Sequence, residues 1–327
     1  MTSITVLHRA LDQAQAFGPF YQGGFFNHLP MALHAAWELG AGEERLVAQL
    51  RHDGGELDDA PILSTSTAKD WRELLGRRQA YAELRLLLQM EIEEEGAEAV
   101  LRSHVPVLIS APHAALFHGL IRTAHAWEGG HAQELACALA SWACTWETLP
   151  GGSSADVMAP DDWQSALRQA GRHSDHRMGQ ARLREAAQST RYAELCDALA
   201  PATHWAVRRE YLLGLALEAY LGSRNFVVLH LITGLRALRV LTPFVPDWPD
   251  VQTWLTRAFT GAWMGANLSG SEQVEKNHVL APPWPELQAL ALAQFDEHVI
   301  KLVHACRQED WLKPDPRWRE AAALAIG

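Results

Sequence analysis

Apolar residues recur every three to four positions along almost the whole chain, which is the spacing of helices with one buried face. Alternating runs of Val, Ile and Thr between turn signals are missing, and this argues against a sheet. Turn formers such as Gly-Ala and Gly-Gly-Glu separate the helical segments. The pattern predicts an all-α protein with helices that include residues 28–39, 112–127, 224–241 and 284–308.

The segment 150–190 is more polar and richer in loop formers than the segments on either side of it. The flanking helices are apolar enough to need each other, and no repeat of fixed period indicates a solenoid. We therefore expect residues 1–327 to form a single multi-helical, bundle-like domain with a central pocket. In this interpretation, 150–190 is a polar excursion at the surface.

The helix expected at 28–39 opens on the polar pair Asn27-His28 and carries His34 six residues later. The Asn27 side-chain oxygen can accept from an exposed backbone amide of the first turn, so we predict that Asn27 caps the helix. At about 100° per residue, the two histidines lie about 120° apart around the axis and cannot both face one cavity. We predict that His28 turns toward a shared pocket, whereas His34 packs or reaches the surface.

Three further helices place polar side chains beside small residues on one face. These side chains are His118, Arg122 and His125 in 117-FHGLIRTAHAWE-128, His230 and Thr233 in 225-NFVVLHLITGLRALR-239, and His298 and Lys301 in 295-FDEHVIKLVHACRQE-309. Small neighbours leave room beside a polar group, so such faces can line a pocket. The competing interpretation is a close helix crossing at which each histidine makes one buried hydrogen bond. We predict that His118, His230 and His298 converge within reach of one small molecule or ion.

Composition narrows the function classes. The chain has 28 basic and 39 acidic residues, a net charge of −11, and this balance argues against nucleic acid as a partner. Four scattered cysteines without a C-x-x-C pair indicate reduced thiols. We see neither a signal peptide nor an apolar run long enough to span a membrane, and we expect a cytoplasmic protein without a membrane partner. The sequence leaves open whether the protein forms a homo-oligomer.

Sixteen histidines raise the question of a metal ion. Helical bundles build metal sites from side chains on facing helices. His28, His118, His230 and His298 on four different helices form one candidate set, and the sequence leaves open whether a metal is bound. No G-x-G-x-x-G follows a strand and no G-x-S-x-G is present, so flavin, nicotinamide and serine-hydrolase fingerprints are missing.

Four of these stretches resemble motifs of one family. The segment 27-NHLPMALHAAWELGA-41 is similar to a fungal NHLPHALLALYALGA-type opening, and 118-HGLIRTAHAWE-128 to an HPLIHLGYAxE helix. Likewise, 226-FVVLHLITGLRAL-238 matches FxLxHxVTxxxAL, and 296-DEHVIKLVHAC-306 matches DEHVxKxxRAL. The motifs occur in the same order as in the questin oxidase-like family, which includes fungal enzymes for Baeyer–Villiger ring opening of anthraquinone-type polyketides. The chain departs from the family at Arg122, where fungal members tend to have His, and at His125, where they tend to have Tyr.

The resemblance implies an oxidoreductase that uses O₂ and NADPH to oxidise an aromatic or polyketide ketone. His118 or His230 would then act as general acid or base, and His298 would complete the catalytic group. Arg122 and Lys301 would donate hydrogen bonds to a developing oxyanion. The substrate-binding set would be His28, His125 and Thr233.

Two other functions stay open at this stage. One is a non-catalytic helical protein that binds a small, aromatic molecule in the same pocket. The other is a purely structural adaptor, for which the polar stripes would be exposed or plugged by side chains.

Overall fold

The computed structural model describes residues 3–62, 68, 70–153, 156–268 and 281–327. Over these residues the chain is predominantly helical, which confirms the predicted all-α class. The helices are α1 (Ile4–Ala14), α2 (Leu29–Glu38), α3 (Glu43–Gly54), α4 (Tyr81–Glu95), α5 (Ala97–Leu108), α6 (His118–Glu128), α7 (Ala132–Cys144), α8 (Pro160–Arg168), α9 (Gly179–Ala187), α10 (Thr190–Leu195), α11 (Trp205–Ser223), α12 (Phe226–Val240), α13 (Pro249–Gly265), α14 (Trp284–Leu292), α15 (Glu297–Leu312) and α16 (Pro316–Ile326). Three 3₁₀ turns, η1 (Trp71–Leu74), η2 (Arg78–Ala80) and η3 (Thr242–Phe244), complete the described helical elements.

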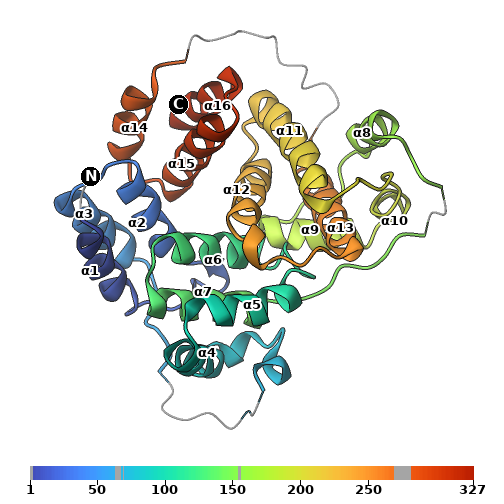
Figure 1. Ribbon diagram of the computed structural model, residues 1–327. Coiled ribbons are helices and arrows are strands. Elements are labelled where there is room, and N and C mark those ends of the chain that lie inside the picture. Colours follow the sequence, from blue (N-terminus) through green and yellow to red (C-terminus); the bar gives the residue numbers. More distant parts are fainter. Residues whose placement is uncertain (1–2, 63–67, 69, 154–155, 269–280) are drawn as a thin grey trace.

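Helices α2, α6, α12 and α15 form a closed ring at the centre of the molecule, because each packs against two of the others (Figure 1). The remaining helices surround this ring. Helices α1 and α3 cover α2, α7 covers α6, α11 and α13 flank α12, and α14 and α16 lie against α15. Elements far apart in the sequence therefore meet at one place, and the four helices that carry the polar stripes are the four of the ring.

Glycines allow two of the closest approaches around α6. A Cβ atom on Gly119 would lie 2.7 Å from the Cα of Trp142 on α7. A Cβ on Gly234 of α12 would lie 3.0 Å from the side chain of Phe117, which precedes α6. The small residues of the polar stripes thus serve close helix packing at these two points, as the competing interpretation of the stripes required.

Two features near the ring differ from the sequence prediction. A small antiparallel hairpin pairs β1 (Phe20–Tyr21) with β2 (Phe25–Phe26), although no strand was expected. Helix α6 begins at His118 rather than at residue 112, because Ala115, Leu116 and Phe117 adopt left-handed backbone angles with φ of 49°, 57° and 69°. Such angles cannot continue a right-handed helix.

Two further expectations near the C-terminus and in the middle of the chain were wrong. The single helix expected at 284–308 is broken into α14 and α15, and Asp296 caps the second helix by accepting from the backbone amide of His298 at 2.8 Å. The segment 150–190 is only partly a surface excursion. Its helices α8 and α9 pack against α13 and bury Trp163 and Leu183 completely, because each helix has its own apolar face.

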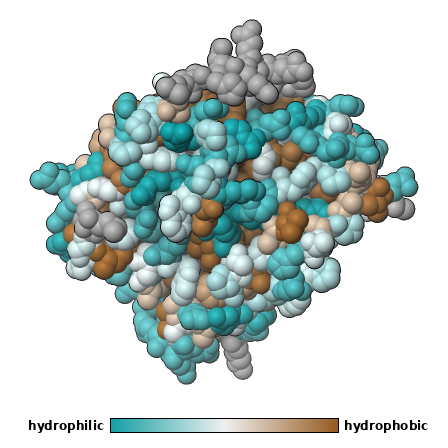
Figure 2. All heavy atoms as spheres, turned by 45° about the horizontal axis from the view of Figure 1, so that its top comes forward, coloured by the Kyte–Doolittle hydropathy of each residue, from teal (hydrophilic) through white to brown (hydrophobic). Residues whose placement is uncertain are grey.

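No helix in the described part of the chain has the length and apolar character that a membrane span requires. On the face shown in Figure 2, hydrophilic and hydrophobic residues are interspersed, and the hydrophobic patches outside the grey residues are small and separate.

Candidate metal centre

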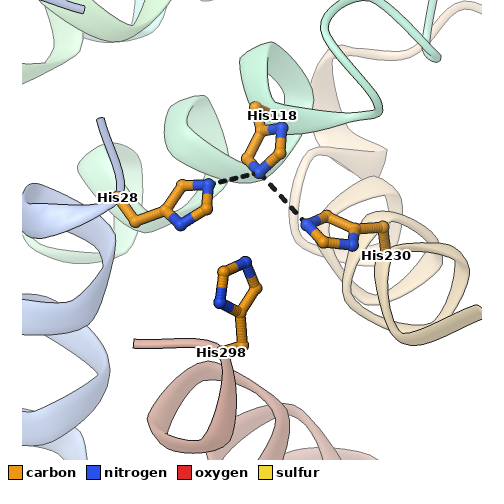
Figure 3. Close-up of side chains that lie close together, drawn as sticks. All are labelled: His28, His118, His230 and His298. Carbon is orange, nitrogen blue, oxygen red and sulfur yellow. Dashed lines mark hydrogen bonds between the residues drawn. The ribbon is translucent and has the colours of Figure 1, made fainter. Parts of the chain in front are cut away.

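Four histidines meet inside the ring, one from each of its helices or helix ends (Figure 3). The Nε2 atom of His118 lies 2.6 Å from Nε2 of His28 and 3.1 Å from Nε2 of His230. The His298 ring lies 4.5 Å from the His28 ring and 5.4 Å from the His230 ring, measured between centroids. One nitrogen of each of the four lies within 4.8 Å of the others. The predicted convergence of His118, His230 and His298 is therefore confirmed, and His28 faces the same point, as expected.

The local sequence explains why His28 points inward. The side-chain oxygen of Asn27 accepts from the backbone amide of Leu29 at 3.0 Å, but the predicted cap is one residue off, because His28 occupies the cap position of α2 without a side-chain capping bond. The amide group of the same side chain donates to the carbonyl of Gly18 at 2.8 Å. Asn27 is completely buried, so these bonds fix the chain at the start of α2 and hold His28 at the mouth of the ring.

The left-handed turn over residues 115–117 places His118. Non-glycine residues pay roughly 1–2 kcal/mol each for left-handed backbone angles, and such strain persists where the surrounding structure enforces it. Here the side chain of Gln180 accepts from the backbone amide of Leu116, and Phe117 packs on Gly234. The turn also brings the carbonyl of Ala115 onto Nδ1 of His118.

The outer nitrogen of every ring faces an oxygen that can only accept a hydrogen bond. Nδ1 of His230 donates to the carbonyl of Phe226 at 2.8 Å, and Nδ1 of His28 donates to Glu297 Oε1 at 3.0 Å. Nδ1 of His298 lies 3.5 Å from Asp296 Oδ1 and 3.6 Å from Glu297 Oε1. Because a neutral imidazole carries one N–H, a proton on Nδ1 leaves a bare lone pair on Nε2. The four inner nitrogens are then all acceptors.

Four acceptors that face one another need a cation or an added proton between them. An added proton is disfavoured, because burial lowers the pKa of all four histidines and the nearby Lys301 ammonium lowers it further. Nε2 of His298 is buried without a hydrogen-bond partner. Metal-binding histidines usually donate their other N–H to a carboxylate or backbone carbonyl, as His28, His118 and His230 do, while Nδ1 of His298 faces two carboxylates at longer range. The donor set therefore fits a transition metal that accepts imidazole, such as iron, copper or zinc.

Two phenylalanines cover the histidine group. The Phe26 ring, from β2, stacks on His118 with a centroid distance of 4.8 Å. Phe226 lies 4.6 Å from the His230 ring and 4.7 Å from the His298 ring. These apolar faces keep bulk water from the inner nitrogens and offer flat surfaces to an aromatic molecule.

A pocket of about 90 Å³ opens beside His28, lined by Tyr21, Asp53, Glu56 and Glu297 among others. Pockets for drug-sized molecules usually hold roughly 300–1,000 Å³. A molecule of that size therefore does not fit beside His28 in this arrangement of side chains.

Lys301 lies one turn beyond His298 on α15 and is only 2% exposed. Burial lowers its pKa to about 8, against the opposing effect of the Glu297 carboxylate. Besides burial, its charge lowers the pKa of His28, His118 and His230. Lys301 therefore belongs to the site region that the sequence indicated.

Arg122 does not join this group, although the sequence stripe placed it beside His118. Its Nε and Nη2 donate to the two carboxylate oxygens of Glu134 on α7, at 2.6 and 2.9 Å, and both side chains are 2% exposed. A third contact runs from Nη1 to Ser141 at 3.4 Å. The Glu134 carboxylate holds the long Arg122 side chain against α7, so its guanidinium is not available to an oxyanion beside the histidines.

Two other residues expected to bind substrate are placed elsewhere. Thr233 donates to the carbonyl of Leu229 on its own helix at 3.1 Å. His125 lies 2.8 Å from the buried His34, Nδ1 to Nδ1, deeper in the ring. His34 thus packs inside, as predicted, and His125 packs with it. The residues that sequence reasoning missed are Glu297, Phe26 and Phe226, each adjacent or nearly adjacent in sequence to a site histidine.

The sequence was compared with known protein families and with curated proteins. The sequence profile described as questin oxidase-like matches residues 25–306. This range runs from β2 into α15 and includes all four histidines. No curated protein matched the chain.

Proposed function

This chain belongs to the questin oxidase-like family, and on that premise we propose that it is a metal-dependent oxidase of an aromatic or polyketide ketone. The family supports an oxidase of polyketide type. The metal, the O₂ and NADPH dependence and the Baeyer–Villiger outcome are our proposal.

One observation carries the proposal of a metal: four neutral imidazoles present Nε2 lone pairs to one point, and each has an oxygen acceptor behind its Nδ1. Imidazole ligands suit iron, copper and zinc, and of these iron and copper change oxidation state readily. A bound iron or copper ion would supply the one-electron chemistry that makes O₂ reactive. His118 and His230 are then ligands, in place of the general acid or base expected from the sequence.

The proposed reaction converts a ketone, O₂, NADPH and H⁺ into an ester or lactone, NADP⁺ and water. One oxygen atom enters the bond between the carbonyl carbon and its neighbour, the other leaves as water, and NADPH supplies two electrons. Lys301 would donate a hydrogen bond to the carbonyl oxygen as negative charge develops there. Phe26 and Phe226 would hold the aromatic part of the substrate and exclude water.

The test combines metal analysis with oxygen uptake. Metal-free protein is loaded separately with Fe²⁺, Cu²⁺ or Zn²⁺ and supplied with an anthraquinone-type ketone, with and without NADPH. We expect oxygen uptake with iron or copper and none with zinc. His230→Ala should abolish uptake and release the metal held by the four histidines, whereas the control Gly214→Ala, at a position with no neighbour within 4 Å of an added Cβ, should keep both.

The alternative function predicts a different result. A non-catalytic binder would bind the ketone, seen as quenching of tryptophan fluorescence, without consuming O₂ or NADPH under any metal condition. That outcome would overturn the proposed oxidase.

A further inference from the structure

The ring helices carry a second layer of polar side chains beyond the four-histidine group. It consists of His34 on α2, His125 on α6, Arg236 on α12 and His304 on α15, each six or seven residues beyond the site histidine of its own helix. At 1.5 Å per residue, the layers lie about 10 Å apart along the helices. All four side chains are at most 4% exposed, so the layer lies in the core.

Three groups in this layer have the spacing of metal ligands. Nδ1 of His34 lies 2.8 Å from Nδ1 of His125, and one ring nitrogen of each lies within 4.8 Å of a carboxylate oxygen of the neighbouring Glu128. His125 and Glu128 are three residues apart on α6 and therefore project from the same face. His34 reaches them from α2. Two imidazoles and one carboxylate are a common ligand set for divalent transition metals.

The surroundings orient the carboxylate. Arg236 Nη2 donates to Glu128 Oε2, and Arg236 Nε donates to Gln308 Oε1 at 2.9 Å. The guanidinium thereby holds one oxygen of Glu128 and leaves the other for an ion, the role that hydrogen-bonding partners play around metal-ligating carboxylates.

His304 stands in the same layer but is not part of the ligand set. The Gln308 oxygen accepts from Arg236 and from Arg239, so its amide nitrogen faces Nε2 of His304, at 3.1 Å. Nε2 is then the acceptor and Nδ1 carries the proton. His304 therefore has no lone pair to offer an ion in this arrangement, and it supplies a matched control.

The protonation states also favour an ion. Burial lowers the pKa of His34 to about 4 and lowers that of His125 well below its usual value, and the Arg236 charge lowers both further. Both imidazoles are neutral at physiological pH, the form that binds metals.

We propose that His34, His125 and Glu128 form a second divalent-metal site, separate from the four-histidine site, with buried imidazoles and a partly exposed carboxylate. Because the three ligands come from α2 and α6, a bound ion ties together two helices of the central ring. The proposal does not depend on the oxidase activity.

The test titrates metal-free protein with Co²⁺ and counts bound ions by equilibrium dialysis and visible absorption. Wild-type protein should bind two ions per chain. His34→Gln and Glu128→Gln should each bind one and retain the wild-type circular dichroism, whereas His304→Gln should still bind two. One ion in the wild type with no change in His34→Gln, or two ions in both, would overturn the second site.

The same titration separates this proposal from the proposed function. His230→Ala should remove only the ion of the four-histidine site and leave the one that depends on His34. If the four histidines bind no ion, the wild type binds one, His34→Gln binds none, and His230→Ala has no effect.

Discussion

The buried ion pair between Arg122 and Glu134 allows a test of whether Arg122 acts in catalysis or in stability. Sequence reasoning made Arg122 a catalytic donor, whereas the structure makes it the partner of a carboxylate on α7. Burial alone would lower the pKa of Arg122, but the Glu134 carboxylate outweighs burial and raises it. We predict that Arg122→Met destabilises the protein strongly and leaves the activity of each folded molecule nearly unchanged.

The magnitude follows from the burial of both groups. Removing one partner of a buried ion pair costs about 3–5 kcal/mol, because the other charge stays buried and unpaired. A chain of 327 residues has an unfolding entropy of roughly 0.7 kcal/mol/K. Arg122→Met should therefore lower Tm by about 4–7 °C. The double variant Arg122→Met/Glu134→Gln removes both charges and keeps an acceptor for Gln15, which donates to Glu134 at 3.0 Å. Its Tm should return to within about 2 °C of the wild type.

The assay combines calorimetry with oxygen uptake measured well below the lower Tm. The two single variants and the double variant form a double-mutant cycle with the wild type. A positive coupling energy in this cycle measures the stabilising interaction between Arg122 and Glu134. Uptake per folded molecule should stay within about twofold of the wild type. A loss of about a hundredfold in uptake with an unchanged Tm would refute this reasoning and restore Arg122 as a donor to the reacting substrate.

Three other predictions follow from single positions. Burial lowers the pKa of His113 to about 3, and neither ring nitrogen has a hydrogen-bond partner, so acid below pH 6.5 protonates the unfolded state first. His113→Leu should therefore lose about 2 kcal/mol less unfolding free energy than the wild type between pH 7 and pH 5, measured by urea denaturation; equal losses would contradict it. Gly119→Ala should destabilise by about 1–3 kcal/mol, since its Cβ would meet the Trp142 backbone at 2.7 Å, whereas Gly214→Ala on α11 should stabilise by about 0.5–1 kcal/mol. Calorimetry that ranks the two variants in the opposite order would show that the α6–α7 contact is not tight. Glu297→Leu removes the acceptor behind His28 and should weaken metal binding by about 10–100-fold in a Co²⁺ titration; an unchanged affinity would show that Glu297 does not support a ligand.

The sequence by itself determined the helical class and the faces on which polar groups lie. Periodicity is a local property, because the angle between two residues of one helix depends only on their separation. This is why His28 and His34 could be assigned to different faces, and why His118, His230 and His298 could each be placed on a polar stripe. The bond from the Leu29 amide to the Asn27 side chain is equally local, although the cap position itself falls at His28 rather than at Asn27.

Tertiary structure decided which of these polar groups meet, because periodicity does not specify how a helix is rotated against its neighbours. Arg122 shares a stripe with His118, yet a carboxylate on α7 engages it. The left-handed turn before His118 contains no glycine, so the sequence did not indicate it. The contacts of Phe117 with Gly234 and of Gln180 with the Leu116 amide hold this turn in place. The tautomers of the four histidines depend on oxygens contributed by the turn before α6, by α12 and by the start of α15. A metal site needs all four lone pairs at one point, and only the assembled ring of helices brings them there.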